Sequence, residues 1–197
     1  SSWKPLEKKL SRKELNLPQK EKLAIYTGNL YPNRGINLVI TLAKKFKEAT
    51  FIVVGGPEKF RKDLVNESET LNLRNIIFLG QVPFAKIHLY QFAADINLGI
   101  WSKEVPTINY CSPLKVFEYM AVSRAIVAMG FPSIKEVLVD GENAFVSDPY
   151  NSNDFINKFE EALNNPEMGC KLAKNARKEA FEKYTWNKRA KEILLKI

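Results

Sequence analysis

Cysteine and histidine are scarce in this chain of 197 residues, which has two of the former and one of the latter. Cys111 and Cys170 show no metal-ligand spacing, and a single pair in a chain of this length is no disulfide framework. The one histidine, His88, stands between Lys86 and Tyr90 in a segment of helical periodicity, where nothing marks it as a catalytic base. We therefore expect no metal site.

Long apolar runs are also missing. No segment approaches the roughly 20 apolar residues of a membrane-spanning helix, and no signal-peptide pattern precedes the first strand-like segment. No strand is followed by the GxGxxG fingerprint, which disfavours a dinucleotide-dependent oxidoreductase. We expect a soluble, cytoplasmic protein. Because the chain begins with Ser rather than Met, we also expect it to be a piece of a longer one.

The net charge of +8 is concentrated at the two ends of the chain. Residues 1–22 hold seven Lys and Arg against three Glu, and residues 166–197 hold nine against four acidic residues. A nucleic-acid-binding protein normally carries its basic surplus on the folded face that binds, so we expect no nucleic acid partner. The basic ends fit a solvated helix surface, an acidic partner domain or an anionic membrane surface.

Short apolar segments alternate with segments of helical periodicity along most of the chain. We expect strands at residues 23–28, 50–56, 76–80, 96–100, 125–129 and 144–147. We expect helices at residues 36–46, 86–94 and 134–139, after Pro113, and in the segment beyond residue 150. Continuous Ile, Val and Leu runs indicate strands that are buried on both faces. The predicted fold class is therefore α/β, with a doubly wound, parallel, six-stranded sheet and extra C-terminal helices.

Ligands of such sheets bind beyond the carboxyl ends of the strands, so the loops that follow the strands are the candidate sites. In GNLYPNRG, Gly28 would let a ligand approach the backbone, and Arg34 offers charged donors to a phosphate or is simply exposed. In GGPEK, Gly56 fits part of a phosphate cradle, but a tight turn before a helix is the simpler interpretation. In GQVP, the backbone at Gln81 and Val82 is placed to read the edge of a base.

The segment SPLKVFEY, residues 112–119, carries the most specific signal. Ser112 is a favoured helix N-cap and Pro113 a favoured first helical residue. The backbone amides of Leu114 and Lys115 would then be free at a helix end that attracts anions. Glu118 lies more than a turn further on, where it would repel phosphate but accept hydrogen bonds from a sugar diol. The alternative is an exposed glutamate of no special role.

Taken in order, these segments resemble the nucleotide-sugar-binding half of retaining GT-B glycosyltransferases of family 4, the glycosyl transferases group 1. That domain typically carries a GRL…P-x-KG loop, a V-G-x-GP turn, an FLG-x-V-P segment, an A-A-D sequence before a strand, and a Glu-x7-Glu motif that ends in L-E-A/Y-M-A. The corresponding segments here are GNLYPNRG, VVGGPE, FLGQVP, AADINLGI and PLKVFEYMA, followed by SRAIVA and VLVDGENAFVSDP. The match runs from about residue 20 to residue 197.

The resemblance implies a role for each of the main candidate residues. Glu118 matches the second glutamate of the motif, which binds the ribose hydroxyls. The amides of Leu114 and Lys115 match the diphosphate-binding helix end, and Arg34 matches a phosphate-binding lysine. The donor implied is a nucleotide diphosphate sugar, UDP- or GDP-linked, with no cofactor and no metal.

Other positions of the motif depart from the family pattern or extend it. Gln81 and Val82 match the loop that reads the base. Tyr110 stands where the family has the first glutamate, which contacts the transferred sugar, and its hydroxyl can still bond a sugar. Asn29 stands where a phosphate-binding arginine is usual. The predicted catalytic residues are thus Arg34, Tyr110 and Glu118, and Gly28, Asn29, Gly56, Ser112 and Pro113 join the predicted binding residues.

The family also implies how the chain fits a whole enzyme. Residues 1–22 would be an interdomain linker, residues 23–185 the Rossmann-like donor domain, and residues 186–197 a helix that crosses back to a missing N-terminal acceptor domain. The reaction expected is retaining transfer of a hexosyl unit such as glucosyl or mannosyl, with the chain inactive alone. The alternative is a degenerate, non-catalytic module that docks to a protein or to the cytoplasmic face of an anionic membrane.

Overall fold

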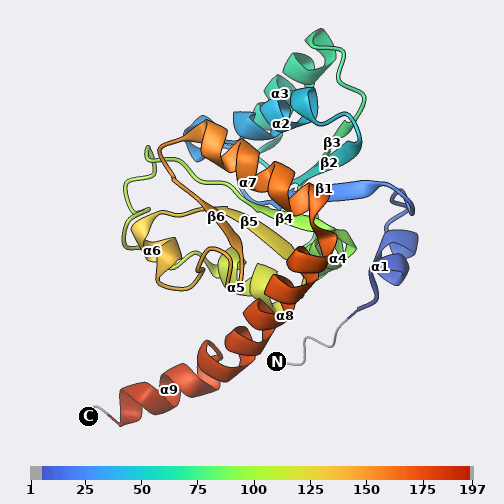
Figure 1. Ribbon diagram of the computed structural model, residues 1–197. Coiled ribbons are helices and arrows are strands. Elements are labelled where there is room, and N and C mark those ends of the chain that lie inside the picture. The colour runs from blue at the N-terminus through green and yellow to red at the C-terminus, as the bar shows by residue number, and fades with distance from the viewer. Residues whose placement is uncertain (1–5, 196–197) are drawn as a thin grey trace.

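The strands form one parallel sheet in the centre of the computed structural model, which describes residues 6–195 (Figure 1). The strands are β1 (Lys22–Thr27), β2 (Ala49–Val54), β3 (Ile76–Gly80), β4 (Ile96–Gly99), β5 (Ala125–Met129) and β6 (Phe145–Ser147). Their order in the sheet is β3-β2-β1-β4-β5-β6, and every pairing is parallel. The predicted doubly wound, six-stranded α/β fold is confirmed. The chain reverses its direction of travel between β1 and β4, which is the switch point of the sheet.

Helices fill the connections between the strands and follow the last one. They are α1 (Lys8–Glu14), the 3-10 helix η1 (Pro32–Arg34), α2 (Asn37–Lys45), α3 (Glu58–Thr70), α4 (Phe84–Ala93), α5 (Leu114–Ala121), α6 (Pro132–Lys135), α7 (Ser152–Asn164), α8 (Pro166–Lys183) and α9 (Trp186–Leu194). The helix predicted at 134–139 is misplaced. It begins at Pro132, because the fixed φ of proline suits the first turn of a helix, and it ends at Lys135.

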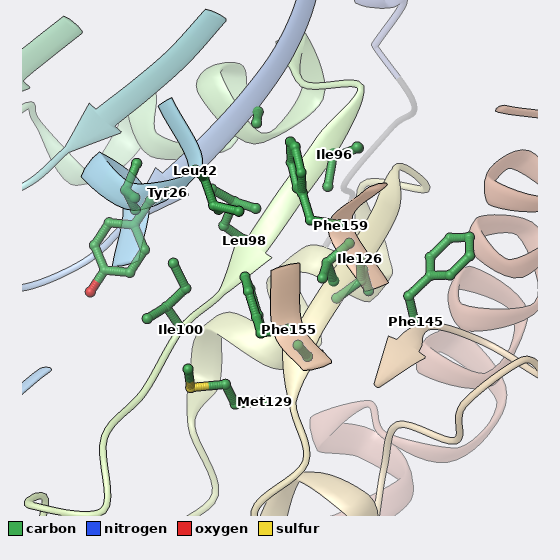
Figure 2. Close-up of a cluster of buried hydrophobic side chains, with 14 of the residues drawn as sticks. Tyr26, Leu42, Ile96, Leu98, Ile100, Ile126, Met129, Phe145, Phe155 and Phe159 are labelled. Atoms are coloured by element: carbon green, nitrogen blue, oxygen red, sulfur yellow. The ribbon is translucent and has the colours of Figure 1, made fainter. Parts of the chain in front are cut away.

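The larger part of the core lies between the sheet and the helices α2 and α7. Figure 2 shows Phe155 and Phe159 of α7 packed among apolar side chains of the central strands. The ring of Phe159 lies 5.0 Å from that of Phe46 and 5.5 Å from that of Phe51. All four rings are almost wholly buried, and burying each is worth about 2 kcal/mol or more. This packing holds the sheet rigid and fixes the edge from which its loops project.

On the other face, a buried ion pair ties α1 to the start of β4. The guanidinium of Arg12, only 2% exposed, donates to Asp95 at 2.7 Å and to the Ala93 carbonyl at 2.8 Å. Asp95 also accepts from Lys8 at 2.5 Å and from the Leu23 amide at 2.8 Å. Burial alone would raise the pKa of Asp95, but these hydrogen bonds and the charges of Lys8 and Arg12 hold it below its usual value. The segment before β1 is therefore packed onto the domain.

At the other end of the chain, α8 and α9 lead away from the sheet (Figure 1). The side chains of α9 whose exposure is described are all exposed, among them Trp186, Ile193 and Leu194. Within residues 6–195, no helix has the length and apolarity to cross a bilayer. The predicted domain limits at residues 22 and 186 stay predictions.

We expect Asp95→Asn to lower the free energy of unfolding at pH 7 by about 3 kcal/mol, because it leaves Arg12 buried without its counter-charge. The carboxylate has a lowered pKa in the folded state, so its contribution is present above about pH 4 and is lost as the pH falls through the folded-state pKa. The difference in the free energy of unfolding between wild type and variant should therefore be smaller at pH 3 than at pH 7. Urea unfolding at both pH values measures it.

The control is Glu160→Gln, which breaks the exposed Lys45–Glu160 pair at 3.0 Å and should cost less than about 1 kcal/mol. Equal losses for Asp95→Asn and Glu160→Gln would contradict the role of the buried pair.

Candidate functional site

A pocket of about 250 Å³ opens at the carboxyl ends of β1 and β4. It is lined by Tyr26, Thr27, Gly28, Asn29, Arg34, Ile87, Ile100, Trp101, Pro113, Leu114, Lys115 and Glu118. These two strands are neighbours at the switch point of the sheet, which is where ligands of doubly wound folds bind. Seven predicted site residues meet here: Gly28, Asn29, Arg34, Pro113, Leu114, Lys115 and Glu118.

The loops behind the pocket are joined backbone to backbone, and glycine makes this joining feasible. The amide of Gly28 donates to the Val54 carbonyl at 2.9 Å, and the amide of Gly55 donates to the Gly80 carbonyl at 2.8 Å. A Cβ atom on Gly55 would lie 1.7 Å from the Gly28 oxygen, and Gly55 has a φ of +151°. No other residue fits this approach without moving the loops. The loops after β1, β2 and β3 are thus locked to one another.

The remaining predicted residues lie outside the pocket lining. Gly56 and Gln81 touch each other, since a Cβ on Gly56 would lie 2.7 Å from Cγ of Gln81. The side chain of Val82 packs against the apolar cluster beneath α1 and α4. Tyr110 is 74% exposed, and Ser112 is exposed as well. The structure therefore brings part of the predicted set together, and the roles of all its members stay predictions.

Pro113, and not Ser112, occupies the N-cap position of α5, so the predicted cap is wrong. Pro113 has φ −68° and ψ 117°, an extended conformation that the proline ring permits, and no side chain caps the helix. The helix consequently begins at Leu114. The amides of Leu114 and Lys115 are the first two of the helix and have no intrahelical acceptor. This end of α5 faces the pocket as an anion-binding helix terminus would.

Two cationic side chains stand beside this helix end. The Lys115 ammonium lies 4.4 Å from the ring centre of Tyr26 and 4.8 Å from that of Trp101. Burial, together with the charge of Arg34, lowers the pKa of Lys115 to about 7, against an opposing pull from Glu118. Arg34 has a buried Nε that finds no acceptor among the described residues. Among the residues described, no carboxylate forms an ion pair with Arg34 or Lys115.

Among the described residues that line the pocket, Glu118 is the one carboxylate. Its Oε2 accepts a hydrogen bond from Nε2 of Gln91 at 2.9 Å. The hydrogen bonds of the described residues leave its Oε1 without a donor. A carboxylate held by one oxygen and open at the other can accept from a hydroxyl group of a ligand.

Sequence reasoning missed Trp101 and Gln91. Trp101 follows β4, and a tryptophan just beyond a strand end is a sequence signal for such a position. Gln91 is the one amide side chain in the apolar stretch FAKIHLYQFAA, but only the structure shows that it is fully buried and reaches Glu118.

Other hollows have a different character. Two apolar ones, of about 430 and 620 Å³, lie along α5 and the junction of α8 and α9, and both include Phe117, Tyr184 and Trp186 in their lining. Another, of about 280 Å³, includes Lys22 and Ile96 at the opposite end of the strands. Among the residues described, no group of three His, Cys, Asp or Glu side chains is placed to hold a metal ion.

Comparison with known proteins identifies relatives along nearly the whole chain. Residues 7–179 match the model of the family described as glycosyl transferases group 1. An uncharacterized glycosyltransferase of Methanocaldococcus jannaschii, MJ1178, is 25% identical over 164 residues, which are 83% of this chain and 44% of that protein. The lipopolysaccharide 1,2-N-acetylglucosaminetransferase of Salmonella typhimurium is 24% identical over 189 residues, 89% of this chain and 48% of that protein. The chain spans about half the length of these relatives.

Solved structures of similar proteins share the fold. Sucrose-phosphate synthase from Thermosynechococcus elongatus superposes with a TM-score of 0.80 at 21% identity, covering 96% of this chain and 49% of that one. Anabaena Alr3699/HepE, solved in complex with UDP-glucose, gives 0.79 at 20% identity, covering 96% and 52%. The C-terminal domain of a glycosyl transferase group 1 family protein, LpcC of Francisella tularensis, gives 0.74 at 22% identity, covering 92% and 95%.

We expect Gly55→Ala to lower the free energy of unfolding by about 4 kcal/mol, because its Cβ would meet the Gly28 carbonyl as well as straining the backbone. Gly141→Ala is the matched control. It also has positive φ, +72°, but no atom lies within 4 Å of the added Cβ, so only strain of about 1 kcal/mol is expected. Thermal unfolding compares the two, and similar losses would contradict the close approach of the loops.

We expect Lys115→Met to be more stable than wild type at pH 7, since it removes an amine that is costly to keep charged. In the unfolded chain this amine keeps a pKa near 10.4, so between about pH 7 and pH 10.4 the unfolded state binds more protons. The free energy of unfolding of the wild type therefore rises with pH in this range, whereas that of the variant lacks this contribution. The difference between the two should shrink toward pH 10. Urea unfolding at pH 7 and pH 10 measures it, and a constant difference would contradict the lowered pKa.

Proposed function

Since the chain belongs to the glycosyl transferases group 1 family, we propose that it binds the nucleotide diphosphate sugar donor of a retaining, metal-independent glycosyltransferase. One observation carries the proposal. A single pocket at the switch point holds a helix end with free amides, two cations, and a carboxylate that is open at one oxygen. Phosphate binds to cations and free amides, whereas sugar hydroxyls can donate to a carboxylate, and one nucleotide carries both groups.

The diphosphate binds at the start of α5 in this proposal. The amides of Leu114 and Lys115 donate to its oxygens, and Arg34 and the Lys115 side chain supply charge. A helix terminus alone contributes only about 0.3 to 1 kcal/mol to an exposed anion, so the two cations are needed. When the sugar leaves, charge grows on the diphosphate, and these preorganised donors stabilise it without rearranging.

The ribose binds at Glu118, whose free oxygen accepts from the diol. The base lies toward Gln81 and Val82, the transferred hexosyl group toward Tyr110, and Asn29 with Gly28 lines the phosphate side. Tyr110, Gln81 and Val82 do not line the pocket itself, and Tyr110 is exposed. We propose UDP or GDP as the nucleotide, and the UDP-glucose in the structure of the similar Anabaena protein supports trying UDP first.

The acceptor binds elsewhere in the whole protein, because this chain spans about half the length of its relatives. We propose that an N-terminal domain holds it and that the exposed apolar side of α9 packs against that domain. The side chains available for this contact include Trp186, Ile193 and Leu194.

The composition of α9 favours a second candidate, a module that docks to an anionic membrane. The same helix combines these exposed apolar residues with Lys188, Arg189 and Lys191, as interfacial helices do. Binding to vesicles of anionic lipid, weakened by salt and unaffected by Glu118→Ala, would support docking. Absence of binding at low salt would exclude it.

We expect Glu118→Ala to weaken binding of the preferred nucleotide diphosphate sugar at least tenfold. The substitution removes one or two charge-assisted hydrogen bonds to the ribose, each worth about 1.5 to 3 kcal/mol. Isothermal titration of the chain with UDP, GDP, ADP and their glucose or mannose conjugates measures the affinity.

Glu67→Ala, which removes an exposed glutamate on α3, is the control and should leave the affinity unchanged. Binding with the same dissociation constant in wild type and Glu118→Ala would overturn the role of Glu118. Absence of binding to every nucleotide at millimolar concentration would favour the docking module.

A further inference from the structure

Gln91 of α4 is fully buried beneath the pocket, although it does not line it. Its Nε2 lies 2.9 Å from Oε2 of Glu118 and 3.2 Å from Oγ1 of Thr27. An amide nitrogen carries two hydrogens, so both bonds can form at once. Gln91 therefore joins the carboxylate on α5 to the last residue of β1.

The hydrogen bonds around Gln91 allow one consistent assignment of donors and acceptors. Thr27 Oγ1 accepts from Gln91 and can donate to the Tyr119 hydroxyl at 3.1 Å, which in turn donates to the Leu98 carbonyl at 3.4 Å. Each hydroxyl hydrogen has one acceptor in this arrangement. With the amide reversed, its oxygen would face the carboxylate of Glu118 with no hydrogen between them. The network therefore fixes the nitrogen of Gln91 toward Glu118.

Folding stability gives no reason for an amide at this position. Oε1 of Gln91 is buried, and none of the described residues donates to it. A buried oxygen without a donor is unfavourable for folding, whereas the sequence neighbours Leu89, Phe92 and Ala93 are buried apolar residues. An apolar side chain would suit the same surroundings. We therefore look for the role of Gln91 in the carboxylate that it binds, Glu118.

We propose that Gln91 is a positioning residue that anchors one oxygen of Glu118 and keeps the other directed at the ribose diol of the donor. The proposal rests on the proposed function. The anchor matters because Glu118 sits near two cations, and a free carboxylate would swing toward them. In that position the carboxylate would pair with the cations that bind phosphate, and it would no longer accept hydrogen bonds from the ribose.

The test is Gln91→Met, which keeps the volume of the side chain and removes the donor. We expect the chain to stay folded and to bind the preferred nucleoside diphosphate about tenfold more weakly. The preference for that nucleotide over its 2′-deoxy counterpart should shrink as well. In the Glu118→Ala background, Gln91→Met should have no further effect on affinity, because it acts through Glu118.

Asn143→Leu is the matched control. Asn143 is also a buried amide that donates to a carboxylate, Glu179 at 3.0 Å, but it lies outside the pocket. It also accepts from the Val139 amide, so its loss should destabilise the fold without changing nucleotide affinity or the 2′-deoxy preference.

Three results would overturn the proposal. Unchanged affinity and 2′-deoxy preference in Gln91→Met would refute it and leave the proposed function standing. Equal weakening by Gln91→Met and Asn143→Leu would show a general structural effect. Failure of the wild type to bind UDP, GDP or ADP would remove the proposed function, and this proposal with it.

Discussion

The pocket depends on the close approach of two backbone segments, Gly28 after β1 and Gly55 after β2. The carbonyl of Gly28 occupies the place that a side chain on Gly55 would need. Because all strands are parallel, their following loops emerge at one edge, and this approach locks two of them together. Arg34 and the start of α5 both line the pocket at this edge. The sheet supplies a rigid base for this edge through the aromatic packing of α7.

Within the pocket, the opposite charges are kept apart. Among the ion pairs of the described residues, none joins Lys115 to Glu118. Lys115 instead lies over the rings of Tyr26 and Trp101, and Glu118 accepts from Gln91. A direct ion pair between Lys115 and Glu118 would neutralise both charges, and neither group would then be free to bind a ligand. In our account, the aromatic rings and the buried amide hold a cationic side for phosphate and a carboxylate side for ribose.

Much of the fold follows from the sequence, since each strand is a short apolar run. Two of the six expected strands match the observed bounds, and the other four differ from them by one or two residues at one or both ends. The site is predictable where it depends on local chemistry, as at Gly28, Arg34 and the helix start near Leu114. The cap at Ser112 failed because proline can adopt either the cap or the first helical position.

Contacts between distant segments could not be predicted. The pair of Arg12 and Asp95 joins residues 83 positions apart, and it turns a segment that reads as a charged linker into a packed helix. Gln91 reaches Glu118 only because the fold brings side chains of α4 and α5, 27 positions apart, within hydrogen-bonding distance. Neither contact leaves a local pattern, since nothing in the sequence around one partner specifies the other.

A crystal structure of the chain with the nucleoside diphosphate that binds most tightly tests the central claim most directly. We expect the diphosphate at the amides of Leu114 and Lys115 with Arg34 beside it. We also expect the ribose hydroxyls on the free oxygen of Glu118, with Gln91 still bonded to the other oxygen. A nucleotide bound in the reverse orientation, or in the apolar hollows along α5 and α9, would contradict this claim.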